Sequence, residues 1–185
     1  MKDFLKKNFV ILLAFALPII LVIIVALSVY LPSIFLSTKY DFIYTSCGDS
    51  SYPYSYSSCN DYMQKHYSVM DNKLVENPGD PTKGKYTDRI FLHDTKNNVS
   101  REITFKEAKE LTLNNFIISP DDATISGHYD SGGDSFFIFG SHSSSFGYYL
   151  MKGNSQKKMN LLNNINGYYY QNNFQFLGWV LPGRN

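Results

Sequence analysis

The four histidines carry the widest range of chemistry in this sequence, because imidazole binds metals and transfers protons near neutral pH. They are His66, His93, His128 and His142. No two of them form a His-x-x-x-His pair and none stands beside a Cys-x-x-Cys sequence, so the spacing typical of zinc sites is missing. We therefore interpret them as isolated strand or loop residues, and we predict no metal ligand and no cofactor.

The segment Asp130-Ser131-Gly132-Gly133-Asp134 offers carboxylate oxygens of the kind that Ca²⁺ prefers. A calcium loop of the EF-hand type alternates acidic positions and ends on a distal Glu, and this segment has neither feature. Glycine and aspartate at this density are typical of a turn. A turn is our interpretation, with a calcium loop as the alternative.

Two Gly-Asp-Ser sequences, Gly48-Asp49-Ser50 and Gly133-Asp134-Ser135, are similar to the nucleophile block of the Gly-Asp-Ser lipases and esterases. That family also needs an Asp-x-x-His pair near its C-terminus, because an oriented imidazole must take the proton of the serine. No histidine follows His142, and none of the four histidines has an Asp three positions before it. Gly140-Ser141-His142 likewise lacks the Gly-x-Ser-x-Gly pattern. We predict no catalytic residue.

The tyrosine run Tyr168, Tyr169 and Tyr170, together with Tyr148-Tyr149, offers an aromatic platform for a glycan or a peptide. Alternate residues of a strand point to opposite faces, so the same run must also fill a core. We favour packing as the main role of these residues, and we keep a binding surface at Tyr168–Tyr170 as the alternative.

The chemistry of two sequence features depends on the cellular compartment in which the domain lies. Cys47 and Cys59 are the two cysteines of the chain, and their spacing predicts one intramolecular disulfide where the surroundings are oxidising, with two free thiols as the alternative. Asn98-Val99-Ser100 is a formal N-glycosylation sequence, which has meaning in a eukaryotic secretory pathway.

The charge balance argues against binding to nucleic acid. The chain has 17 Lys+Arg and 16 Asp+Glu. The densest basic cluster after the first eight residues is Lys157-Lys158 with Lys152 nearby, which we interpret as a solvated turn rather than a basic face.

A run without charged side chains, Phe9–Leu27, predicts a membrane helix, and weaker apolar sequence extends it to residue 36. Lys2, Lys6 and Lys7 precede the run, so the positive-inside rule places residues 1–8 in the cytoplasm and residues 37–185 outside it. A cleaved signal peptide, cut after Ser28, is the alternative. The run is longer than a secretory apolar region, which favours an uncleaved signal anchor over 9–36.

After the anchor, short aromatic and β-branched runs between polar turns predict an all-β, mainly antiparallel domain. We divide it into a Tyr/Ser-rich disulfide loop with a hairpin, 37–85, and a β domain, 86–185. Thr104-Phe105-Lys106-Glu107 fits a capping box and predicts the single short helix, through about Leu111. The predicted strands are Tyr40–Thr45, Lys65–Met70, Lys73–Glu76, Arg89–His93, Arg101–Thr104, Asn115–Ser119, Ala123–His128, Ser135–Phe139, Gly147–Met151, Lys158–Leu162, Tyr168–Tyr170 and Phe174–Leu181.

An offset of 58 positions suggests an internal repeat within 86–185, since it aligns Phe91 with Tyr149 and Phe116 with Phe174. Within about residues 86–180, Ser119-Pro120-Asp121 resembles the Ser-Pro-Asp-Gly turn in blades of the β-propellers typified by the Tol translocation protein, with Asp122 where Gly is usual. The resemblance implies strand-turn-strand units, arranged as partial-propeller-like or meander sheets. The chain is too short for a closed ring of blades, and the resemblance transfers no functional residue.

Together these observations predict a non-catalytic, membrane-anchored extracytoplasmic module with a binding or structural role, as an accessory subunit of a membrane or envelope assembly. Its expected partners are the lipid bilayer and either another protein or a second copy of the chain. The alternative is a membrane-tethered hydrolase built from scattered Asp, His and Ser residues.

Overall fold

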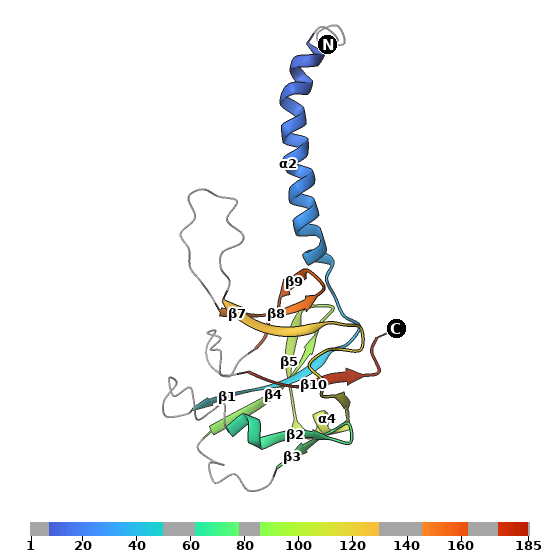
Figure 1. Ribbon diagram of the computed structural model, residues 1–185. Helices are drawn as coiled ribbons and strands as arrows, with labels where there is room; N and C mark the ends of the chain where they lie inside the picture. Colours follow the sequence, from blue (N-terminus) through green and yellow to red (C-terminus); the bar gives the residue numbers. More distant parts are fainter. Residues whose placement is uncertain (1–7, 50–61, 78–85, 130–145, 163–173, 185) are drawn as a thin grey trace. The chain divides into compact units, whose positions relative to one another are not determined.

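The computed structural model of the protein describes residues 8–49, 62–77, 86–129, 146–162 and 174–184. The chain divides into two compact units, 1–36 and 37–185 (Figure 1). Several predicted features lie outside the described residues, namely Cys59, the strands Ser135–Phe139 and Tyr168–Tyr170, the Asp130–Asp134 turn and His142.

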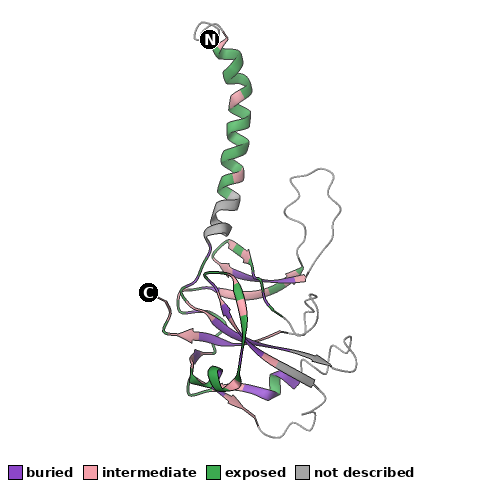
Figure 2. Ribbon diagram, turned by 180° about the vertical axis from the view of Figure 1, so that it is seen from behind, coloured by how far each residue is buried: buried purple, intermediate pink, exposed green. Residues whose placement is uncertain are grey.

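The described part of the first unit forms an apolar helix, α2 (Phe9–Phe35), which matches the helix expected over 9–36. Its Phe9–Ser28 part is 20 residues long, none of it is buried, and by length and composition it is able to cross a membrane. Figure 2 shows this exposed surface along most of the helix. Pro18 lies within the helix without interrupting it.

The second unit is built from antiparallel sheets, as the composition predicted. The largest has five strands in the order β5-β4-β1-β10-β6, a second has the order β7-β8-β9, and β2-β3 is a separate hairpin. Only the second sheet is a simple meander, and the described residues contain no closed propeller. The strands are β1 (Phe42–Asp49), β2 (Tyr67–Met70), β3 (Lys73–Glu76), β4 (Tyr86–Asp94), β5 (Val99–Ile103), β6 (Thr112–Asn114), β7 (Thr124–Tyr129), β8 (Phe146–Lys152), β9 (Ser155–Lys158) and β10 (Gln175–Leu181).

The first five residues of the central strand β1, Phe42 to Ser46, are all buried, so both faces of this part of the strand are covered. On one face Phe42 packs against Trp179 with 5.6 Å between ring centroids, and Tyr44 stacks on Phe91 at 5.2 Å. On the other face Ile43 belongs to a core that includes residues from the β2-β3 hairpin and from helix α4 (Phe105–Glu110). Residues 37–85 and 86–185 therefore contribute strands to the same sheet, with β1 paired to both β4 and β10.

Local signals predicted two elements correctly. The hairpin β2-β3 turns at Asp71 and Asn72, whose φ angles of 49° and 59° are the left-handed values that a two-residue hairpin turn requires. Helix α4 begins with the expected capping box, because the Thr104 hydroxyl accepts from the backbone N–H of Glu107 and the Glu107 carboxylate accepts from that of Thr104.

The prediction of a single short helix was wrong. Residues 62–66 are also helical, so the strand expected from Lys65 begins only at Tyr67. The cause is a helical spacing of buried side chains: Tyr62 and His66, one turn apart, are 3% exposed each and stack with 4.8 Å between their rings.

Two predicted strands are not strands in the structure, and side chains accept or replace some of their backbone hydrogen bonds. The Asn114 carboxamide accepts from the N–H of Phe116 at 3.0 Å, and this turn ends β6 where the strand Asn115–Ser119 was expected. Lys158–Leu162 was expected to be a strand, but β9 ends at Lys158. Beyond it, the N–H of Leu162 donates to the hydroxyl of Tyr44 at 2.8 Å.

The positions related by the 58-residue offset lie in different structural environments. Phe91 lies in β4 of the five-stranded sheet and Tyr149 in β8 of the three-stranded one. Phe116 is 72% exposed, whereas Phe174 stacks on Tyr44 at 5.1 Å.

Candidate functional site

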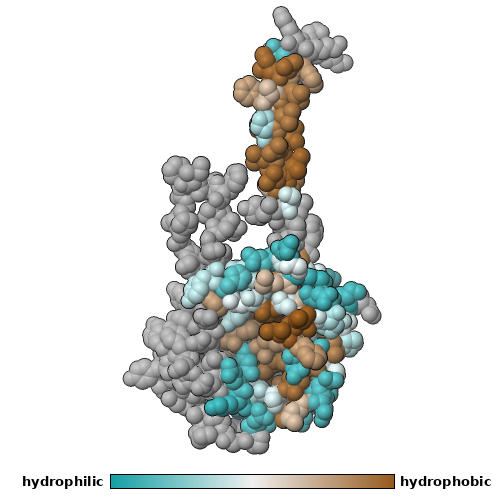
Figure 3. Space-filling view, viewed as in Figure 1, coloured by the Kyte–Doolittle hydropathy of each residue, from teal (hydrophilic) through white to brown (hydrophobic). Residues whose placement is uncertain are grey.

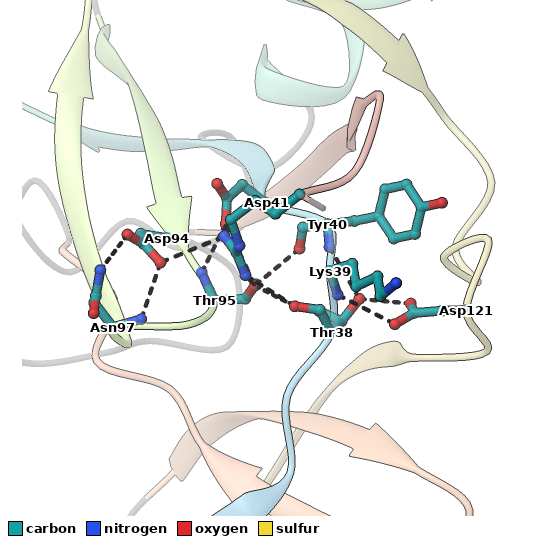
Figure 4. A network of polar contacts seen from close by, with 9 residues as sticks. Thr38, Lys39, Tyr40, Asp41, Asp94, Thr95, Asn97 and Asp121 are labelled. Atoms are coloured by element: carbon teal, nitrogen blue, oxygen red, sulfur yellow. Dashed lines mark hydrogen bonds and ion pairs between the residues drawn. The ribbon is translucent and has the colours of Figure 1, made fainter.

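A carboxylate from a distant turn binds the segment that follows helix α2. The Asp121 carboxylate accepts from the Thr38 hydroxyl at 2.6 Å and from the backbone N–H of Lys39 at 3.2 Å (Figure 4). It also accepts from the Ser119 hydroxyl at 2.6 Å and from the Lys152 ammonium at 3.2 Å. Burial by itself would raise the pKa of Asp121, but these four donors together lower it to about 2.

Arg184, near the C-terminal end of the chain, makes a second set of contacts with this segment. The Arg184 guanidinium donates to the Thr38 carbonyl at 2.9 Å and to the Thr95 hydroxyl at 2.8 Å, and it pairs with the Asp41 carboxylate. The Thr95 N–H donates to Asp41 at 3.0 Å, and the backbone N–H of Arg184 donates to the Lys39 carbonyl at 2.7 Å. We call Thr38, Asp41, Thr95, Asp121 and Arg184 the clasp.

The local turn that supplies Asp121 has a clear physical cause. Asp122 has φ 65°, so this residue adopts the left-handed conformation for which glycine is the usual choice. The Ser119 hydroxyl accepts from the N–H of Ala123 at 2.8 Å, which closes the turn. The Ser-Pro-Asp sequence thus signalled a turn, but it did not signal that Asp121 reaches a residue 83 positions away.

The clasp borders a polar pocket of about 390 Å³, which we call the basic pocket. Four of its lining side chains are cationic and one is anionic. The lining residues are Ser37, Thr38, Lys39, Lys96, Asp121, Lys152 and Arg184. None of the lysines in this pocket was singled out from the sequence as a binding residue, except that Lys152 was noted as part of a basic cluster.

One serine and one histidine meet on neighbouring strands. His93 of β4 lies directly opposite Ser100 of β5, and the His93 Nδ1 and Ser100 Oγ atoms are 2.8 Å apart. His93 is 1% exposed, and burial lowers its pKa to about 4 despite the nearby carboxylates of Asp41 and Asp94. A base of that pKa is poorly matched to proton transfer at neutral pH, and within the described residues no carboxylate is hydrogen-bonded to this imidazole. We interpret the pair as a buried cross-strand contact.

A loop between β6 and β7 exposes three consecutive large apolar residues. Phe116, Ile117 and Ile118 are 72%, 64% and 51% exposed. In Figure 3, hydrophobic residues gather on one face of the domain and are surrounded by hydrophilic ones. The neighbouring edge of β6 is blocked by the hairpin turn, since the N–H of Leu113 donates to the Asn72 carbonyl at 2.8 Å. The surface exposed here therefore consists of the side chains of Phe116, Ile117 and Ile118, and not of the backbone edge of β6.

The residues predicted as a site are only partly described. Tyr168, Tyr169, Tyr170 and Cys59 lie outside the described residues, and so the aromatic surface and the disulfide stay predictions. Tyr148 and Tyr149 are described and are 8% and 5% exposed, so both belong to the core. Among the described parts of the chain, no group of three His, Cys, Asp or Glu side chains is arranged to hold a metal ion.

No family model, curated protein or solved structure matches this chain. The likeness to propeller blades therefore stays an expectation from the sequence.

Proposed function

We propose that the chain is a non-catalytic, single-pass membrane protein whose β domain is held on the extracytoplasmic side as a binding or structural module. The observation that carries this proposal is the continuity of the chain between the apolar helix α2, whose Phe9–Ser28 part has no buried residue, and the bound segment that begins at Thr38. An apolar helix surface of this length is stable in lipid and costly in water, because each buried CH₂ group contributes about 0.8 kcal/mol.

The clasp supports a positioning role. Thr38 to Asp41 are bound to the loop after β4, to the turn before β7 and to the C-terminal residues. The contacts within the second unit therefore begin at Thr38, its second residue. A module that must work close to a membrane surface is served by such an arrangement, whereas a long linker would let it diffuse away from that surface.

The exposed Phe116–Ile118 loop supports the proposal that the chain binds a partner. Contiguous apolar surface on a soluble domain commonly marks a contact with another molecule. We propose a protein of the same membrane as the occupant, so that the chain is an accessory subunit of a larger assembly. A second copy of the chain is the competing outcome.

The orientation is tested with the chain's own glycosylation sequence, Asn98-Val99-Ser100, which is the only Asn-x-Ser/Thr sequence present. The full chain is translated with microsomes of the endoplasmic reticulum. We expect a product that resists alkaline extraction and carries one glycan, and Asn98→Gln should lack the glycan. Replacing Lys2, Lys6 and Lys7 by Glu should lower the glycosylated fraction, because it reverses the charge bias. An unglycosylated product that alkali releases contradicts the proposal.

A further inference from the structure

The basic pocket has more positive charge than its own contacts neutralise. Lys39 and Lys96 are exposed, and neither ammonium group has a hydrogen-bond or ion-pair partner among the described residues. Lys152 is paired only with Asp121 in that part of the chain, at 3.2 Å. The Asp121 carboxylate in turn is held by four donors, so its negative charge is compensated before any ligand arrives.

The backbone of the pocket is held in place by the clasp. Lys39 follows Thr38, whose hydroxyl and carbonyl are both bound, and Lys96 follows Thr95, whose N–H donates to Asp41 at 3.0 Å. Two lysines from segments far apart in the sequence are thus brought to one pocket before a ligand binds. Such preorganisation reduces the entropy lost on binding.

Chain length places this pocket near lipid headgroups if α2 spans the bilayer. At about 1.5 Å per residue, the 20 residues of Phe9–Ser28 cover about 30 Å, which is the thickness of the hydrocarbon core. The rest of α2 reaches into the headgroup region, and Ser37, the first pocket residue, comes two positions after its end.

We propose that the basic pocket binds the phosphate group of an anionic phospholipid, with Lys39 and Lys96 as the cationic donors. The inference rests on the proposed function, because the anchor brings this ligand within reach. Lysine ammonium groups bind phosphate as point charges, and a volume of about 390 Å³ is adequate for a small headgroup. Arg184 lines the pocket but is occupied by the clasp, so it stabilises the site rather than donating to the ligand.

The test measures amine acetylation of each lysine by mass spectrometry, using the full chain in nanodiscs. Three conditions are compared: phosphatidylcholine alone, phosphatidylcholine mixed with phosphatidylglycerol, and phosphatidylcholine with added inorganic phosphate. Lys106 and Lys109 of α4, which are exposed and have no partner in the described structure, serve as internal references. We expect phosphatidylglycerol to slow acetylation of Lys39 and Lys96 by about fivefold relative to these references.

A matched pair of variants gives a second readout. Lys39→Gln/Lys96→Gln should retain about tenfold less phosphatidylglycerol than the wild type, whereas Lys106→Gln/Lys109→Gln, which removes the same charge, should retain the normal amount. The proposed site is overturned if both variants lose the same amount of bound phosphatidylglycerol. It is also overturned if this lipid does not protect Lys39 and Lys96 from acetylation.

Protection by inorganic phosphate as strong as that by phosphatidylglycerol overturns the lipid source and assigns the pocket to a free phosphate. Alkaline extraction of the same nanodisc protein separates the two proposals. If the chain resists extraction but Lys39 and Lys96 are unprotected, only the pocket inference fails. If the chain is extracted, the proposed function fails and the inference with it.

Discussion

Thr38 donates its hydroxyl hydrogen to the carboxylate of Asp121 over 2.6 Å, across 83 positions of the sequence. Thr38 is the second residue after the first unit and is 3% exposed. Its hydroxyl oxygen also accepts from the N–H of Tyr40 at 3.2 Å. One buried hydroxyl therefore joins the start of the second unit to the turn before β7.

Thr38→Val should destabilise the second unit, because it keeps the shape of the side chain and removes the hydroxyl. We expect the free energy of unfolding to fall by about 1.5 kcal/mol, the lower end of the range for a hydrogen bond to a charged group. Urea denaturation of the full chain in detergent, followed by the fluorescence of the single, buried Trp179, gives this quantity. Thr112→Val is the control, since the described residues contain no hydrogen bond from that hydroxyl; equal losses in the two variants would contradict the assignment.

Arg184→Gln should have a larger effect, because it leaves Asp41 without its cation and frees the Thr38 carbonyl. The Arg184 side chain is 31% exposed, so we expect a loss of about 2 kcal/mol rather than the larger effect of a fully buried pair. Arg89→Gln is the matched control, since Arg89 pairs with Glu102 at the surface and should contribute less than about 1 kcal/mol. The same Trp179 fluorescence assay applies. A control that loses as much stability as Arg184→Gln contradicts a special role for the clasp.

Acid should destabilise the domain through His93. The imidazole of the unfolded chain binds a proton as the pH falls through about 6.5, but the folded one stays neutral until about 4. Stability is therefore lost between these two pH values, by up to about 3 kcal/mol, and His93 contributes no pH dependence above them. Urea titrations at a series of pH values check this. The slope of stability against pH in this range should flatten in His93→Gln, and an unchanged slope would exclude His93 as its cause.

Asp121 acts in a lower pH range. Its folded pKa of about 2 lies below the ordinary value of 3.8, so its stabilising contribution is present above 3.8 and is lost as the pH falls through about 2. Asp121→Asn should reduce the loss of stability in this range without changing the loss between pH 6.5 and 4. The same titrations separate the two residues.

The Phe116–Ile118 loop should matter for association and not for folding. Ile117→Ser removes a side chain that is 64% exposed, so we expect a change in unfolding free energy of less than about 0.5 kcal/mol. A photo-crosslinking residue at position 117 should give a discrete adduct in native membranes, and one at Met70, which is 59% exposed, should not. An adduct of twice the chain mass identifies a second copy as the partner. The absence of any adduct at 117 contradicts the proposed docking loop.

Elements whose hydrogen bonds close within a few residues were predicted well from the sequence. The capping box pairs Thr104 with Glu107, three positions apart, and the hairpin turn depends only on Asp71 and Asn72. The apolar run of α2 is equally local. By contrast, the apolar segment at 116–118 has the composition of a strand, and an Asn114 side-chain hydrogen bond diverts it into a loop.

The sequence by itself determined that an apolar helix precedes an aromatic, antiparallel β domain, because periodicity and turn residues act over short distances. Only the tertiary structure decided that Arg184 and Asp121 meet the residues after helix α2. Those contacts join positions 146 and 83 residues apart, and nothing in the local chemistry of either residue distinguishes a clasp from a solvated turn. The basic pocket has the same origin, since Lys39, Lys96 and Lys152 become neighbours only when the strands that carry them fold together.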